Sequence, residues 1–370
     1  MVARAGNFPL RKVVMGARGS DIPEQSGYLS TGQTSCHDGD GRIIPCAGSG
    51  QDAEFRAGVP WPEPRFEMDH HHHHHHHHNN NNNVVLDRLT GLMWTRHANL
   101  AEYPMTWPEA LDFVASMNRE RALGFSDWRL PNRRELRSLV SHQTRRPALP
   151  EQHPFFNVFA GWYWSSTTAA ISSAHAWYVN MDGARMFYGG KDQSYLVWPV
   201  RGESRVLPAT GQRQCFDVQG REILCRGTGQ DGERRAGCAW SEPRFMVQGD
   251  KVLDHLTCLY WMRRADLTYG PVSWPEALAA VTALNREQPQ GELWRLPNVN
   301  ELESLVDCSA HSPALPRGHP FEEVQAAYWS STTSLFEPDW AWALYMEKGA
   351  IGVGQKHGRH FHVWAVRQKV

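Results

Sequence analysis

Four cysteines occur as two pairs with identical spacing. Cys36 and Cys46 enclose nine residues, as do Cys215 and Cys225, and each enclosed segment carries glycine near its middle. This spacing is typical of a short hairpin, across which two thiols can face each other. In an oxidising compartment we expect both pairs to be disulfides, each contributing about 2 to 3 kcal/mol to its segment. Reduced thiols in a cytosolic protein are the rival interpretation. A four-cysteine zinc site is weaker, because Cys-x9-Cys is not a zinc-knuckle spacing.

A histidine run is the most obvious candidate for metal chemistry. His70, His71 and His72 open a tract that continues to His78 and is followed by asparagines 79–83. Clustered imidazoles bind zinc, nickel or copper, but no matching ligand set surrounds the tract. Both homopolymers lack the apolar surface that would repay the entropy of ordering them. We therefore expect a solvated loop with adventitious metal affinity at most, and predict neither a metal site nor a cofactor.

Catalytic motifs are weakly represented. Residues 227–232 match the dinucleotide pattern GxGxxG, but they lack the strand-then-helix context that this motif needs. Arg129 and Arg295 are better explained as buried partners of carboxylates than as anion ligands. Glu135 and Glu301 fall at helix starts, where capping accounts for them. We therefore predict that the protein is not an enzyme.

The composition excludes some classes of partner. The chain has 370 residues, with 38 Lys and Arg against 39 Asp and Glu, so a formal charge of −1 does not suit nucleic acid or an anionic membrane. No run of 18 apolar residues suggests a transmembrane segment. The first 30 residues lack the apolar run of a signal peptide. At about 100 to 200 residues per domain, the length favours two domains.

The sequence repeats itself. Trp128-Arg129-Leu130-Pro131-Asn132 matches Trp294-Arg295-Leu296-Pro297-Asn298, and residues 163–168 match 328–333. We therefore expect two tandem domains, each folding independently. The predicted boundaries are an N-terminal tail (1–30), leader 1 (31–66), a His/Asn loop (67–83), module 1 (84–201), a linker (202–209), leader 2 (210–250) and module 2 (251–367). Cysteines without a counterpart in the first copy, at least one of them expected to be free, are Cys238, Cys258 and Cys308.

Each module shows two helix starts followed by strands. Thr106 with Glu109, and Ser273 with Glu276, have the spacing of a capping box, as do Asn132 with Glu135 and Asn298 with Glu301. Later segments rich in Trp, Tyr, Val and Thr are typical of antiparallel strands, and Asp182-Gly183 predicts a hairpin turn. Two helices followed by a run of strands predict an α+β fold.

The linked motifs resemble the Lcl C-terminal domain family. They are Leu-Thr-Gly-Leu-Met-Trp, Trp-x-Glu-Ala-Leu, Asp-Trp-Arg-Leu-Pro-Asn-x-x-Glu-Leu, Tyr-Trp-Ser-Ser-Thr-Thr and a final Val-Arg, over residues 84–201 and 251–367. The resemblance implies a C-type-lectin-like fold, related to the formylglycine-generating enzymes, in proteins of the bacterial envelope or exterior. Each module would then carry two short helices and an antiparallel sheet behind a Cys-hairpin leader. The absence of a visible signal peptide leaves a cytoplasmic location open.

The resemblance favours recognition over catalysis. We expect a non-catalytic envelope or secreted protein that binds glycan or protein surfaces through its loops. The alternatives are a divergent formylglycine-generating enzyme, in which Cys308 is the late thiol, and a structural interaction module without a small ligand. The calcium-dependent sugar motifs of lectins are missing. Loop residues predicted to contact ligand are His175, Asp182, Arg185, Tyr188, Asp192, Asp339, Trp340, Glu347, His357, Arg359 and His360.

Overall fold

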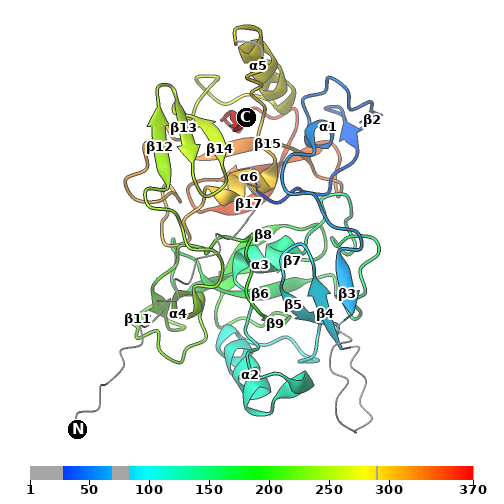
Figure 1. Ribbon diagram of the computed structural model, residues 1–370, viewed down its shortest axis with the longest axis vertical. Coiled ribbons are helices and arrows are strands. Elements are labelled where there is room, and N and C mark those ends of the chain that lie inside the picture. The colour runs from blue at the N-terminus through cyan, green and yellow to red at the C-terminus, as the bar shows by residue number, and fades with distance from the viewer. Residues whose placement is uncertain (1–27, 69–82, 289–290, 370) are drawn as a thin grey trace, which may run out of the picture.

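The computed structural model describes residues 28–68, 83–288 and 291–369 (Figure 1). It is an α+β structure with short helices and antiparallel sheets, as the order of sequence patterns predicts. The His/Asn tract lies outside the described residues apart from Asn83, so the expectation of a solvated loop stays a prediction.

Each module contains a four-stranded antiparallel sheet. In module 1 its order is β3-β4-β5-β9, and in module 2 it is β12-β13-β14-β18. The first strand of each sheet begins at or near the end of the preceding leader, and β3 extends two residues into the segment assigned to the His/Asn loop. The last strand carries the Val-Arg that ends each repeat. The strands are β3 (Phe66–Met68), β4 (Val84–Asp87), β5 (Met93–Thr95), β9 (Val200–Arg201), β12 (Phe245–Gln248), β13 (Lys251–Asp254), β14 (Leu259–Met262) and β18 (Val366–Gln368).

A six-stranded sheet is shared by the two modules, in the order β15-β16-β17-β8-β7-β6 (Figure 1). The modules meet where Met186 of β8 pairs with Ile351 of β17. The predicted hairpin at Asp182-Gly183 is confirmed, since it joins β7 to β8. The strands are β6 (Trp162–Thr168), β7 (His175–Asn180), β8 (Met186–Gly190), β15 (Ala327–Thr333), β16 (Trp340–Tyr345) and β17 (Ala350–Gln355).

All four predicted capping boxes are present. The longer helices α2 (Trp107–Arg119) and α5 (Trp274–Arg286) have a proline in the first turn, and they bury an apolar stripe that begins with tryptophan. The shorter helices α3 (Arg133–Ser138) and α6 (Val299–Ser304) are almost fully buried. A short 3-10 helix, η1 (Ala122–Gly124), follows α2.

Both leaders are disulfide-linked hairpins followed by one helical turn. The Cα atoms of Cys36 and Cys46 are 5.3 Å apart, and those of Cys215 and Cys225 are 5.1 Å apart. The predicted disulfides are therefore present, while the three cysteines without a counterpart are free. The elements are β1 (Cys36–His37), β2 (Ile43–Ile44), α1 (Asp52–Phe55), β10 (Cys215–Phe216), β11 (Glu222–Ile223) and α4 (Asp231–Arg234).

The leaders cross over, so that leader 1 packs on module 2 and leader 2 packs on module 1 (Figure 1). The side-chain amide of Gln33 exchanges two hydrogen bonds with the backbone of Thr333, at 2.8 and 2.9 Å. Gln212 makes the equivalent pair with Thr168, both at 2.8 Å. Each glutamine thus satisfies the backbone at the end of a strand in the other repeat. This exchange, which the sequence patterns did not predict, gives a physical reason to doubt that each module folds alone.

Candidate ligand cleft

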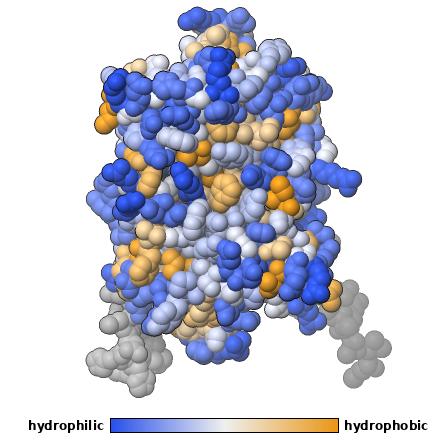
Figure 2. Space-filling view, turned by 180° about the vertical axis from the view of Figure 1, so that it is seen from behind, coloured by the Kyte–Doolittle hydropathy of each residue, from blue (hydrophilic) through white to orange (hydrophobic). Residues whose placement is uncertain are grey.

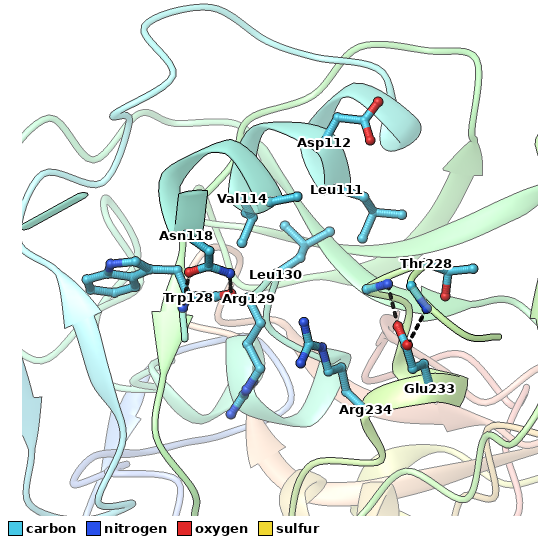
Figure 3. Close-up of a pocket in the computed structure, with 13 residues that line it drawn as sticks. Leu111, Asp112, Val114, Asn118, Trp128, Arg129, Leu130, Thr228, Glu233 and Arg234 are labelled. Atoms are coloured by element: carbon cyan, nitrogen blue, oxygen red, sulfur yellow. Dashed lines mark hydrogen bonds between the residues drawn. The ribbon is translucent and has the colours of Figure 1, made fainter. Parts of the chain in front are cut away.

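The crossing of leader 2 creates a cleft of about 210 Å³ against module 1 (Figure 3). One wall is α2 together with the extended segment 128–130, and the other is the glycine-rich loop and α4 of leader 2. Its lining residues are Leu111, Asp112, Val114, Ala115, Asn118, Trp128, Arg129, Leu130, Gly227, Thr228, Gly229, Glu233 and Arg234.

The module wall of the cleft is rigid and largely apolar. Leu111, Val114 and Leu130 supply its hydrophobic surface (Figure 3). The side chain of Asn118 locks the chain beside it: its amide donates to the carbonyl of Trp128 at 2.7 Å, and its oxygen accepts from the backbone of Trp128 at 2.6 Å. Because both hydrogen bonds are partly buried, we expect this wall to keep its shape when a ligand binds.

The leader wall is a glycine-rich loop whose amides are already occupied. The backbone N–H groups of Gly227 and Gly229 donate to the two carboxylate oxygens of Glu233, at 2.5 and 2.7 Å (Figure 3). Both glycines have positive φ, +78° and +69°, which directs their amides inward. The loop follows a disulfide hairpin and enters a helix of four residues. Its Gly-x-Gly pattern is thus explained by binding its own carboxylate rather than a dinucleotide phosphate.

Arg129, at the base of the cleft, is neutralised within module 1. Its guanidinium binds Glu135 through two hydrogen bonds, at 2.5 and 2.7 Å, and also donates to the carbonyl of Gly202. Arg295 binds Glu301 in the same way. The prediction that these arginines are partners of buried carboxylates is therefore confirmed.

Two exposed charges of the cleft have no ion pair within the described chain. Arg234, on α4, extends its guanidinium toward the cleft from the leader side, whereas Asp112 lies on α2 (Figure 3). Opposite charges on two walls are suited to a polar ligand that carries both kinds of hydrogen-bonding group. These two residues escaped the sequence analysis, because the cleft exists only where a leader meets the module of the other repeat.

The equivalent junction, between leader 1 and module 2, has the same framework without these charges. Gly48 and Gly50 donate to Glu54, as their counterparts do to Glu233. At the positions of Asp112 and Arg234, however, this junction has Ala279 and Phe55. The carboxylate-filled loop is therefore common to both leaders, while the charged pair distinguishes the junction of leader 2 with module 1.

Most of the loop residues predicted from sequence already have protein partners. Asp182 forms a 2.7 Å ion pair with Arg146, and Arg185 lies 3.5 Å from Glu337 across the junction between modules. His175 contacts the hydroxyl of Ser172 at 2.8 Å, and its ring packs on Tyr188. These residues support the shared sheet and its turns.

Of the remaining predicted residues, some contact leader 1 and others lie on the exposed surface. His357 contacts Asp40 of the leader 1 hairpin at 2.8 Å, and the backbone of Asp339 lies against Gly41 of the same hairpin. Arg359 reaches Glu276 at 3.4 Å. Trp340 is half-buried at the start of β16. Predicted residues with exposed side chains are Arg185, Asp192, Glu347, His357, Arg359 and His360. Nothing in these contacts tests ligand binding, so all eleven residues stay candidates.

Two lysines from the same loops hold the leaders in place. The ammonium of Lys356 donates to the carbonyls of His37 and Asp38 at 3.3 and 3.0 Å, and lies 4.2 Å from the ring of Trp274. Lys191 holds leader 2 in the same way, over the ring of Trp107. Burial lowers the pKa of each lysine to about 7.

The thiol expected for the enzymatic alternative is poorly suited to nucleophilic attack. Cys308 is 3 % exposed, and burial raises the pKa of its thiol to about 12. A thiol with this pKa stays protonated at neutral pH, whereas the thiolate is the nucleophile. Cys238 is also free, and burial raises its pKa as well.

On the face shown in Figure 2, the hydrophobic side chains of the described residues form small patches among hydrophilic ones. Among the described residues, no helix has the length and apolar character needed to cross a bilayer. Over the same residues, histidine, cysteine, aspartate and glutamate do not gather in a group of three that could hold a metal ion.

The Lcl C-terminal domain family matches the chain twice, over residues 83–201 and 250–367. These two matches cover more than half of the sequence, so the chain belongs to this family as a tandem of two domains. They agree closely with the module boundaries predicted from the repeat. None of the curated proteins compared with the chain is similar to it.

Proposed function

We propose that this protein is a non-catalytic recognition protein, and that the cleft between α2 and leader 2 holds a glycan or a peptide. The proposal rests on which charged side chains of the cleft already have a partner within the protein and which do not. Glu233 and Arg129 are held by the protein itself, whereas Arg234 and Asp112 are exposed and free of ion pairs within the described chain. An apolar wall between such groups suits binding of a polar ligand with a hydrophobic face.

The chemistry of the cleft favours binding over turnover. A general acid or base needs access to the proton it transfers, and a nucleophile needs a neighbouring base. The inner carboxylate, Glu233, accepts two backbone hydrogen bonds instead. The formylglycine-generating alternative gains no support from Cys308, because that thiol is buried.

We propose further that the modules are C-type-lectin-like and that the protein works outside the cytoplasm. Two disulfides fit an oxidising compartment, and an antiparallel sheet framed by loops fits a lectin-like module. On this proposal, exposed loop residues such as Asp192 and His360 are secondary contacts beyond the cleft.

The proposal is tested by screening the full chain against glycan and peptide arrays, followed by calorimetric titration of the best ligand. We expect Arg234→Ala to weaken binding about tenfold, as loss of a hydrogen bond to a charged group does. Arg234→Phe, which introduces the residue found at the equivalent position of leader 1, Phe55, is expected to weaken it similarly. Arg213→Ala, at an exposed position of leader 2 outside the cleft, is the matched control. Unchanged affinity in both Arg234 variants would contradict the proposal.

A further inference from the structure

The outer edge of strand β11, in the disulfide hairpin of leader 2, has no backbone partner within the described chain. β11 pairs only with β10, and beyond their two paired positions Asp217 donates its amide to the carbonyl of Arg221 at 2.9 Å. The hydrogen bonds of an antiparallel strand alternate between its two edges. Ile223 therefore faces β10, whereas the backbone groups of Glu222 and Leu224 point to the outer edge.

The opposite edge of the same hairpin is covered by leader 2 itself. The side-chain oxygen of Gln230 accepts from the backbone N–H of Phe216, and its amide donates to the carbonyl of Phe216, both at 3.0 Å. The hairpin is therefore a two-stranded sheet with one satisfied edge and one free edge, and a free edge is a template for an added strand. Figure 1 shows β11 on the outside of the molecule beside α4, which forms part of the cleft.

One position of this edge differs between the two leaders. Leu224 is 90 % exposed, the largest value for any large hydrophobic residue of the described chain. The equivalent residue of leader 1 is Pro45, which has no N–H to donate. Proline is one of the residues that protect a sheet edge from an added strand. The edge in leader 1 is thus blocked at this point, while the edge in leader 2, which borders the charged cleft, is open.

The exposed charges near the open edge are mainly positive. Between residues 221 and 235, the exposed charged side chains are Arg221, Glu222, Arg226, Arg234 and Arg235. Arg221 forms an ion pair with Asp217 at 2.8 Å. Arg226 and Arg234 have no ion pair with any residue that the structure describes. A partner with negative charge is therefore the electrostatic complement of this surface.

We propose that the free edge of β11 binds an extended acidic peptide as a third strand, and that the peptide continues past Gly227 into the cleft. Glu222 and Leu224 exchange main-chain hydrogen bonds with the peptide. Arg226 and Arg234 then bind its carboxylates. This inference rests on the proposed function and narrows its ligand to a peptide, because a sheet edge recognises a row of backbone N–H and C=O groups.

Two occupants supplied by the protein itself are disfavoured by charge. A second copy pairing through its own β11 would bring the same arginines together, and like charges across a strand pair are destabilising. Residues 1–27 contain four Lys and Arg against two Asp and Glu, so this segment also carries net positive charge. An acidic peptide avoids both repulsions.

The test is a titration of a fluorescent nine-residue peptide of alternating valine and glutamate with the full chain, followed by fluorescence anisotropy. Leu224→Pro should weaken binding at least about fivefold, because one backbone hydrogen bond is lost and the ring obstructs the added strand. The hairpin should tolerate this change, since leader 1 has Pro45 at the same position. Leu224→Val keeps the N–H and an apolar side chain, and should retain most of the affinity.

The charged contact and the hydrogen bonds have separate measurements. Arg226→Ala, which introduces the residue that leader 1 has at position 47, should weaken binding about threefold at low salt and less at high salt. A peptide of alternating valine and lysine is the charge-reversed control and should not bind. When the acidic peptide binds, amide exchange of Glu222 and Leu224 should slow, while that of Ile223, which already bonds to β10, should stay unchanged.

The outcomes separate this inference from the proposal for the cleft. If Arg234→Ala weakens binding and Leu224→Pro does not, the cleft binds its ligand without an added strand and the inference is wrong. If only Leu224→Pro weakens binding, strand addition stands and the role of the cleft fails. Absence of binding by the acidic peptide would overturn the inference, and so would a dimer of the unmodified chain that Leu224→Pro dissociates.

Discussion

Thr167 of module 1 donates its hydroxyl hydrogen bond to Asp231 of leader 2, at 2.7 Å. The second repeat makes the same contact across the molecule, from Thr332 to Asp52, also at 2.7 Å. In each case a second hydroxyl, from Thr31 to Asp52 and from Thr210 to Asp231, donates to the same carboxylate oxygen. The two leaders are therefore docked through identical buried carboxylates, each contacted by the module of the other repeat.

These carboxylates should make stability depend on pH. Burial raises the pKa of Asp52 and of Asp231 to about 6, from an ordinary value of 3.8. The nearby charges are Glu301 and Arg295 for Asp52, and Glu135 and Arg134 for Asp231. Because the folded protein holds these protons more tightly than the unfolded chain, their contribution is complete below about pH 4 and is lost as the pH rises through 6.

Asp52→Asn should remove this dependence from leader 1. Relative to the unmodified chain, we expect the free energy of unfolding of the variant to rise by about 2 kcal/mol between pH 4 and pH 7, since the amide has no proton to lose. Urea unfolding at several pH values measures this difference. Asp192→Asn, at an exposed loop position, is the control and should show none. A pH profile for Asp52→Asn parallel to that of the unmodified chain would refute the assignment.

The buried lysines give a test of the crossed arrangement. Lys356→Met should loosen leader 1 at the opposite end of the sequence, because the ammonium binds the carbonyls of His37 and Asp38. We expect amide hydrogen exchange over residues 36–46 to accelerate at least about tenfold, as expected for loss of hydrogen bonds to a charged donor. Residues 215–225 serve as the internal control and should be unchanged.

Lys191→Met is the reciprocal experiment and should affect residues 215–225 alone, since it holds leader 2. If each variant instead loosened the leader that directly precedes its own module, the crossed arrangement would be wrong.

The crossed leaders also predict how the chain behaves when it is cut at the linker. Residues 1–201 and 202–370 each carry the leader that docks on the other half, and the shared sheet joins them at Met186 and Ile351. We expect the two fragments to form a stable one-to-one complex when mixed, measured by size-exclusion chromatography. We also expect residues 251–370 alone to melt well below the full chain. Two fragments that stay monomeric and melt cooperatively without associating would restore the simpler view of independent modules.

The sequence by itself determined the local structure of this protein. The capping boxes at Thr106 and Ser273 and the hairpin at Asp182-Gly183 depend on contacts between residues a few positions apart, so their spacing alone predicts them. The disulfides can likewise be predicted from local spacing, because the ten-residue separation of Cys36 and Cys46 already brings the thiols within reach.

The tertiary structure alone decided which leader meets which module. A buried pair such as Asp52 and Thr332 is separated by 280 residues, and each partner has an equivalent in the other repeat, so the sequence permits either pairing. The choice follows from long-range packing at the junction, where β8 joins β17 and the arginines of α3 meet Glu303. The cleft beside Arg234 could not be foreseen for the same reason, because its two walls come from different repeats.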